Sequence, residues 1–208
     1  GAVAGRAAPR RLRVAPRRVL LPVPSPVARA LRRRSPYASS SPSSVDEEVG
    51  FPALMADPHE IADEADVVFA CMPSIDSFHS IINGEDPVIH GKQMKTFVNL
   101  GTMGTEALAK AENILTENGI SMLDAPITGG VQRAWDADIT VITSGPQRIY
   151  NQIEPFIKSF ARDIHYVGDK IGQAQIAKIC NNIMSFTNML VGIEALTMAA
   201  KGGVDPRK

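Results

Sequence analysis

Residues 96–124 read TFVNLGTMGTEALAKAENILTENGISMLD, and this stretch decides the fold. Its two ends, Thr96–Leu100 and Ile120–Asp124, are short apolar segments of strand length. Residues 105–118 between them have the composition of a helix, with a threonine capping box at the start and Gly119 at the end. Two strands of one sheet that are joined through a helix run parallel, so the stretch predicts a β-α-β unit.

The same alternation continues on both sides of this unit. Further strands are predicted at residues 67–72, 139–143 and 164–167, and further helices at residues 57–64, 74–82 and 147–160. Residues 67–72 are an uninterrupted apolar run closed by Pro73, which is typical of a strand buried on both faces. The sequence therefore predicts an α/β fold with a mainly parallel sheet and helices on both faces.

A long helix is predicted for residues 172–201, which contain no proline and are followed by Gly202-Gly203. Apolar residues recur there at every third or fourth position, as a stripe along one side. They are Ile176, Ile179, Ile183, Phe186, Leu190, Ile193, Leu196 and Ala200. A helix of ~45 Å usually extends beyond its parent domain. An apolar stripe that nothing in the chain covers indicates that a packing partner is missing. We therefore expect it to pack on another subunit, as in a homo-oligomer, or on the rest of a truncated helical domain.

The overall composition excludes several classes of protein. Hydrophobic residues make up 44% of the 208 residues, as in ordinary soluble globular proteins. The longest apolar runs, such as Val67–Met72, are far shorter than the ~20 residues that span a bilayer, so no membrane segment is expected. Two cysteines, Cys71 and Cys180, and four scattered histidines predict neither a disulfide framework nor a metal site.

Residues 1–44 differ sharply from the rest of the chain in charge. They contain ten arginines and no acidic residue, whereas residues 45–208 contain 12 basic and 22 acidic residues. Proline and serine are frequent in this head, and we expect it to be disordered. Its composition is also typical of a mitochondrial or plastid transit peptide; otherwise we expect a cytoplasmic protein. A nucleic-acid-binding arm is a weaker alternative, because the remainder is acidic and lacks interleaved basic and aromatic residues.

One candidate site is the segment Asp124-Ala-Pro-Ile-Thr-Gly-Gly130, directly after a predicted strand. Ligands of open α/β sheets bind at the carboxyl ends of the strands. Thr128 offers a hydroxyl group, and Gly129 and Gly130 let backbone N–H groups approach an anion. The alternative is a plain turn in which the two glycines only make the corner.

A second candidate site lies on the long helix, where Lys178 is followed by Asn181 and Asn182. Lys178 and Asn182 are four residues apart and share one helix face. A lysine held against apolar surface has a lowered pKa and can act as a general acid or base. The alternative is a solvated lysine beside two tolerated asparagines, although asparagine is a poor helix former.

Taken in order, Asp124–Val131 and Gly172–Asn182 resemble the motifs of the β-hydroxyacid dehydrogenase family, which has a 6-phosphogluconate dehydrogenase-like NAD(P)-binding domain; 3-hydroxyisobutyrate dehydrogenases are its nearest members. The resemblance implies a Rossmann-type domain, incomplete here, then an interdomain helix leading into a helical domain. It also implies that Thr128, at a position where the family usually has serine, holds the substrate carboxylate together with Gly129 and Gly130. Lys178 matches the family's catalytic lysine, and Asn182 matches the asparagine that orients the substrate hydroxyl.

The resemblance further implies NAD or NADP as the cofactor, with Met72, Pro73 and Thr102 at its cofactor-contacting positions. The sequence departs from the family at its start, because no G-x-G-x-x-G fingerprint for the pyrophosphate is present. If residues 18–22 are aligned with the first strand, two prolines and a valine occupy the glycine positions, and no phosphate cradle is expected. The glycine expected at Ala137 is also missing.

These observations predict three regions: a head of residues 1–44, a partial Rossmann-type dinucleotide-binding domain of residues 45–167, and the start of a helical domain in residues 168–208. The function they predict is NAD(P)-dependent oxidoreduction of small, hydroxyisobutyrate-like 3-hydroxyacids by an incomplete member of the family. The alternative is a non-catalytic relative that no longer binds a dinucleotide.

Overall fold

The computed structural model describes residues 19–20 and 58–207. The elements in chain order are β1 Val19–Leu20, α2 Pro58–Glu64, β2 Val67–Ala70, α3 Ile75–Asn83, the 3-10 helix η2 Val88–His90, β3 Thr96–Asn99, α4 Thr105–Glu117, β4 Ser121–Asp124, β5 Ile127–Thr128, α5 Gly130–Trp135, β6 Ile139–Ser144, α6 Gln147–Ile157, β7 Ala161–Gly168 and α7 Gln173–Lys201. Strands and helices alternate over most of this order, as the sequence predicts.

The strands form one sheet in the order β1-β2-β3-β4-β6-β5, with β7 also paired to β6. The first four strands are parallel, and β6 runs antiparallel to β4 and to β5 but parallel to β7. The predicted α/β class with a mainly parallel, Rossmann-type sheet is confirmed. The short elements η2, β5 and α5 were not predicted, and the last two lie in the segment that carries Thr128, Gly129 and Gly130.

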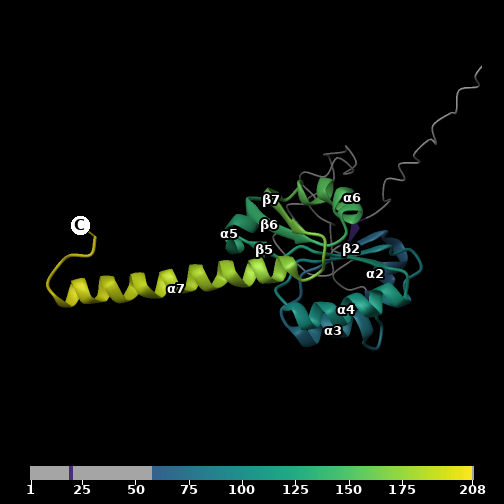
Figure 1. Ribbon diagram of the computed structural model, residues 1–208, viewed down its shortest axis with the longest axis horizontal. Coiled ribbons are helices and arrows are strands. Elements are labelled where there is room, and N and C mark those ends of the chain that lie inside the picture. Colours follow the sequence, from purple (N-terminus) through teal and green to yellow (C-terminus); the bar gives the residue numbers. More distant parts are fainter. Residues whose placement is uncertain (1–18, 21–57, 208) are drawn as a thin grey trace, which may run out of the picture.

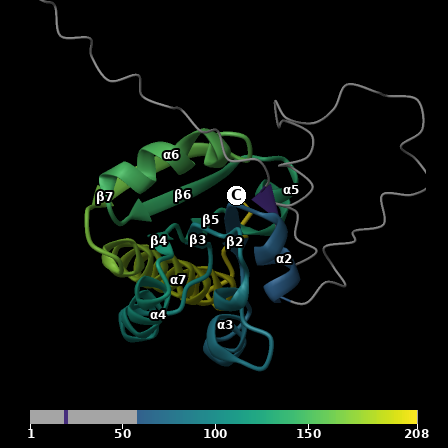
Figure 2. The same cartoon turned by 90° about the vertical axis from the view of Figure 1, so that its right-hand side faces the viewer.

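Two apolar clusters form the core, one on each face of the sheet. Alternate residues of β2 separate between them: Val68 belongs to the cluster with α2, α3 and α4, and Phe69 belongs to the cluster with α6. Figure 2 shows α6 on one side of the sheet and α3 and α4 on the other. The prediction of helices on both faces is therefore correct. The strand predicted at residues 67–72 is buried on both sides over Val67–Ala70, where β2 ends, and the two residues that follow are half-buried.

Some helix ends follow local sequence signals and others do not. Ser74 caps α3 through a capping box with Ser77, and Gly119 follows α4 with a φ of 72°, as expected of a helix stop. The threonine capping box predicted at the start of α4 is wrong. The N-cap residue there is Gly104, at a φ of 82°, and no side chain caps the helix.

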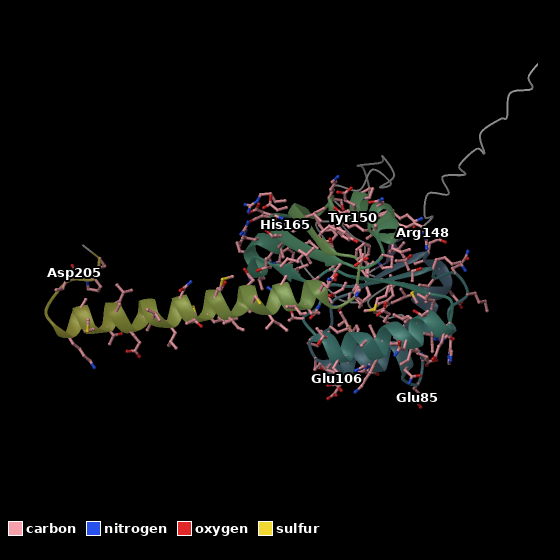
Figure 3. The ribbon with its side chains drawn as sticks, viewed as in Figure 1. Glu85, Glu106, Arg148, Tyr150, His165 and Asp205 are labelled. Carbon is pink, nitrogen blue, oxygen red and sulfur yellow. The ribbon has the colours of Figure 1, made fainter. Side chains whose placement is uncertain are left out.

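Helix α7 extends away from the sheet, as Figure 1 shows. It has 29 residues, which confirms the predicted long helix. The prediction of a single apolar stripe is too narrow, because the consecutive residues Met189, Leu190 and Val191 are all exposed and point in directions about 100° apart. Side chains project on opposite sides of α7 in Figure 3.

By length and composition alone, α7 is also apolar enough to cross a membrane. The sequence expectation counted uninterrupted apolar runs, and it passed over α7 because single polar residues interrupt the helix. Core helices of soluble proteins meet the same criterion, so this property does not by itself assign α7 to a membrane.

Within the arginine-rich head, the structure describes only β1, which pairs in parallel with β2 through Val19 and Val67. The expected disorder of residues 1–44 otherwise concerns residues outside the described part of the chain. Residues 22–27, which include the positions aligned with the missing glycine fingerprint, also lie outside the described part of the chain.

Candidate active site

The carboxyl ends of three parallel strands form the edge on which the candidate residues gather. Ala70, Asn99 and Asp124, the last residues of β2, β3 and β4, are in register with one another. The loops that follow them carry the cofactor positions and the Thr128 segment. This is the edge at which open α/β sheets bind ligands.

Asp124 is fully buried at this edge. Its Oδ1 accepts hydrogen bonds from Asn99 Nδ2 at 3.1 Å and from Gln175 Nε2 at 2.8 Å, and its Oδ2 accepts one from the Gln175 backbone N–H at 3.2 Å. Burial raises the pKa of Asp124 from 3.8 to about 6, although these hydrogen bonds favour the charged form. Asp124 therefore changes charge closer to neutral pH than an ordinary aspartate.

Two strand residues cap the start of α7. The N-cap residue Gly172 has no side chain to accept the free N–H groups of the first turn. Instead, Asp124 accepts from the N–H of Gln175, and Ser144 Oγ accepts from the N–H of Ala174 at 2.9 Å. A carboxylate at a helix N-terminus is also favoured by the helix dipole. The first turn of α7 is thereby fixed to β4 and β6.

Gln175 is a buried residue that the sequence analysis did not select. Its Oε1 accepts from the N–H groups of Met103 at 2.9 Å and Gly104 at 3.1 Å, and its Nε2 donates to Gly101 O at 3.0 Å and to Asp124. All four hydrogen-bonding positions of one side-chain amide are therefore used. A helix residue that reaches contacts more than 50 residues away leaves no periodic signal in the sequence; its spacing of three from Lys178 is the only local hint.

Lys178 lies one turn beyond Gln175 and is 8% exposed. Burial lowers the pKa of its amine below the ordinary value for lysine, because a charged ammonium is disfavoured away from water. The structure thus gives Lys178 the partly desolvated environment that its position on the helix predicted. The alternative of a fully solvated surface lysine is not what the structure has.

Thr128 and the two glycines form a corner between β5 and α5. Thr128 pairs with Thr140 of β6, and Gly129 and Gly130 have φ values of 133° and 77°. Both glycines occupy backbone conformations that other residues rarely adopt. A Cβ at Gly129 would also lie 3.3 Å from Cβ of Arg133. The glycines do make a turn, but the turn also presents Thr128 to α7.

The contact between this corner and α7 is made by Asn181. Its Nδ2 donates a hydrogen bond of 3.4 Å to Thr128 Oγ1. Asn182, selected by the family resemblance, is half-buried one turn after Lys178. Asn181 is therefore a further residue of the site, and its spacing of three from Lys178 is the sequence signal that indicates it.

The three predicted cofactor positions lie in the loops after β2 and β3. Met72 is half-buried, whereas Pro73 and Thr102 are exposed. An exposed hydroxyl and an exposed apolar ring on adjacent strand ends fit the position at which a dinucleotide crosses such an edge. Within residues 19–20 and 58–207, no group of three or more His, Cys, Asp or Glu side chains could hold a metal ion.

Two family models match the chain. The NAD binding domain of 6-phosphogluconate dehydrogenase matches residues 38–168. The NAD-binding of NADP-dependent 3-hydroxyisobutyrate dehydrogenase matches residues 172–208. The first match covers more than half of the chain, and the second begins one residue before α7. Both models describe NAD(P)-binding proteins, so the cofactor class is NAD or NADP.

Curated relatives match the chain at modest identity. The 3-hydroxyisobutyrate dehydrogenase of Pseudomonas aeruginosa is 31% identical over 145 residues, which are 68% of this chain and 48% of that protein. The 2-(hydroxymethyl)glutarate dehydrogenase of Eubacterium barkeri is 27% identical over 148 residues, which are 71% of this chain and 49% of that protein. The chain spans about half the length of these relatives.

A solved structure agrees with the fold. The 3-hydroxyisobutyrate dehydrogenase of Mycobacterium tuberculosis, determined with L-serine, superposes with a TM-score of 0.65 at 25% sequence identity. The superposition covers 72% of this chain and 50% of that chain. The sequence motifs, the family models and the superposition therefore all indicate the same family and fold.

Proposed function

The chain belongs to the β-hydroxyacid dehydrogenase family, and from this premise we propose that it takes part in the NAD(P)-dependent interconversion of a small 3-hydroxyacid and its semialdehyde. The observation that carries the proposal is that α7, which bears the buried Lys178, contacts Thr128 of β5 through Asn181. Lys178 is buried one turn after the helix start, and Asn181, three residues later, hydrogen-bonds Thr128. This contact supports the proposal that a proton-transfer group on α7 and a carboxylate-binding segment at Thr128 act on one substrate.

Lys178 is the proposed general acid–base. Oxidation of an alcohol requires its hydroxyl proton to leave as the C–H bond is broken, and reduction requires the proton to return. A lysine with a lowered pKa exchanges this proton near neutral pH more readily than an ordinary lysine. The nicotinamide cofactor, when bound, accepts or supplies the hydride.

The substrate carboxylate is proposed to lie at Thr128, Gly129 and Gly130. The positive φ values of the two glycines make a corner at the start of α5, where free N–H groups suit an anion, and Thr128 adds a hydroxyl donor. Asn182, on the same helix face as Lys178, is proposed to orient the substrate hydroxyl. Met72, Pro73 and Thr102 are the proposed cofactor contacts.

We propose a hydroxyisobutyrate-like substrate, that is, a small acid with its hydroxyl on the third carbon. The relatives named above act on acids of this kind that differ in the rest of the molecule. Thr128 has one methyl group more than the serine usual in the family, which favours a small side chain on the acid.

A non-catalytic role is the second candidate, and the sequence of residues 18–27 favours it. Proline at positions 22 and 24 removes N–H groups from the place where the family binds the pyrophosphate. Such a relative would keep the scaffold and lose dinucleotide binding. Calorimetric titration of the full chain with NAD and with NADP separates the two roles, because only the dehydrogenase requires binding.

The experiment that tests the proposal follows formation of reduced nicotinamide by the full chain with a panel of small 3-hydroxyacids. Lys178→Arg is the test variant, and Lys201→Arg, an exposed lysine of the same helix, is the matched control. We expect turnover with wild type and with Lys201→Arg and none with Lys178→Arg. Equal turnover by both variants, or no turnover by a wild-type chain that binds the cofactor, contradicts the proposal.

A further inference from the structure

The amide of Gln175 joins the loop after β3 and the end of β4 to the helix that carries Lys178. Its Oε1 accepts from Met103 and Gly104, and its Nε2 donates to Gly101. These three residues surround Thr102, one of the proposed cofactor contacts. The same Nε2 donates to Asp124, at the end of the strand that leads to the Thr128 corner.

The surroundings of this amide leave it little freedom. Gln175 and Asp124 are both 0% exposed. Asn99 Nδ2 donates to Asp124 Oδ1 and to Gly101 O, and Asn99 Oδ1 accepts from the Gly101 N–H. A buried amide whose donors and acceptor are all satisfied is held in one orientation, since each alternative leaves a buried polar group without a partner. Gln175 thus defines where the first turn of α7 lies against the sheet.

We infer that Gln175 is a positioning residue, which places the Lys178 amine at the strand edge by tying the first turn of α7 to Asp124 and to the loop around Thr102. Lys178 follows Gln175 by three residues on a continuous helix, so a shift of the first turn moves both. The role of Lys178 in proton transfer rests on the proposed function; its placement by Gln175 does not.

The test measures the amine of Lys178 directly, without cofactor or substrate. The full chain is labelled with an amine-acylating reagent across a pH series, and labelling at Lys178 is read by peptide mass spectrometry against a free amine standard. Burial gives the wild-type amine a low titration midpoint. Loss of its position exposes it to water and moves that midpoint upward.

Gln175→Met is the main variant, because methionine keeps the length of the side chain, adds no charge and removes all four hydrogen bonds. We expect its Lys178 midpoint to rise from the wild-type midpoint toward that of the free amine standard, because the amine is exposed to water. Gln152→Met is the matched control, since Gln152 is exposed on α6, and we expect the wild-type midpoint from it.

Asp124→Asn serves as the conservative variant. An asparagine oxygen can still accept from Gln175 Nε2 and Asn99 Nδ2, but its –NH2 group cannot accept from the Gln175 backbone N–H. The midpoint should therefore rise less than in Asp124→Leu, which removes all three hydrogen bonds. A folded Gln175→Met chain with an unchanged midpoint overturns the inference. If Gln175→Met does not fold, Gln175→Asn, whose amide is one methylene too short to reach, decides by the same criterion.

Turnover separates this inference from the proposed function. If wild type is active, Gln175→Met should lose kcat, on the order of 10²-fold for a group displaced by about 1 Å, with a smaller change in KM. If the wild-type chain shows no turnover although Gln175→Met has a raised Lys178 midpoint, the positioning role is supported and the proposed function is contradicted. An active chain whose Gln175→Met variant keeps both midpoint and kcat overturns the positioning role alone.

Discussion

Asn181 Nδ2 hydrogen-bonds Thr128 Oγ1 at 3.4 Å, and this contact joins α7 to the β5–α5 corner. The two residues come from the two motifs that the sequence analysis treated separately. Their contact places the motifs on one strand edge. The proposed substrate binding at Thr128 and the proposed proton transfer at Lys178 can be tested by independent substitutions.

We expect Lys178→Arg to reduce kcat by the ~10²–10⁴-fold typical of a lost general acid–base. Arginine keeps the positive charge but stays protonated, so it cannot exchange the hydroxyl proton. Affinity for NAD(P), measured by titration of the cofactor alone, should change little. A variant that keeps more than about a tenth of the activity would contradict the assignment of Lys178.

Thr128→Ala should mainly raise KM, by about tenfold or more, because a hydrogen bond to a carboxylate is lost from the ground state and the transition state alike. Thr128→Ser keeps the hydroxyl and should keep KM within a few-fold of wild type. Asn181→Ala should act in the same direction as Thr128→Ala. The double variant should cost less than the two single changes added together, since both residues share one contact. Additive effects in this double-mutant cycle would show that Asn181 does not act through Thr128.

Much of the fold could be predicted because the strands carry their own signal. Residues 67–70 and 96–99 are buried along their whole length, and such runs are visible without any knowledge of partners. Strand β5 has two residues and helix α5 has six, too few to show a period, so neither element was predicted within the candidate site at residues 124–130. Only one apolar stripe was predicted on α7, because residues were selected for their spacing of three or four. Apolar residues on the other sides of the helix do not fit that spacing and were left out.

Site residues that belong to a motif could be predicted from the sequence. A site residue whose role depends on its buried long-range contacts could not. Lys178 and Thr128 belong to recognisable motifs, whereas Gln175 is a polar residue on a helix like many others. Its importance comes from Asp124, 51 residues earlier, and from the Gly101–Gly104 loop, more than 70 residues earlier. Contacts at such separations are fixed by the sheet topology, which sequence periodicity does not reveal.

Asp124 should make stability depend on pH in the direction opposite to an ion-paired aspartate. Its folded-state pKa is about 6 and its ordinary value is 3.8, so folding takes up a proton between these values. The stability that Asp124 contributes is full below pH ~4 and is lost as the pH rises through about 6, with a total change of about 3 kcal/mol.

Urea unfolding of the chain between about pH 4 and pH 7 measures this effect. Asp124→Asn should remove the decline, because asparagine does not titrate. Asp76→Asn, an exposed change at the start of α3, should leave it in place. The same decline in wild type and Asp124→Asn would show that another group causes it.

Gly129→Ala should destabilise the fold by about 1–3 kcal/mol, the usual cost of a side chain in an unfavourable backbone conformation. The φ of Gly129 is 133°, and a Cβ there would lie within 3.4 Å of Arg133 and Ile139. Gly192→Ala is the matched control, because Gly192 lies inside α7 with no atom near the added methyl, where alanine favours the helix. Chemical denaturation of both variants measures the difference, and an equal stability of both would contradict the strained corner.

Self-association through α7 is the last prediction, and it follows from the exposure of the helix. Leu190 is 59% exposed, and large apolar neighbours surround it on several sides of α7. We propose that α7 packs against a second copy of the chain, so the sedimentation mass should rise with protein concentration.

Leu190→Lys removes about 1.5 kcal/mol or more of apolar burial from each copy of a two-fold dimer, which weakens association on the order of 10²-fold. Asn188→Lys adds the same charge at an exposed polar position nearby and should have a much smaller effect. A wild-type chain that stays monomeric at high concentration, or that floats with uncharged lipid vesicles instead of self-associating, would contradict the proposed oligomer; flotation would instead place α7 in a membrane.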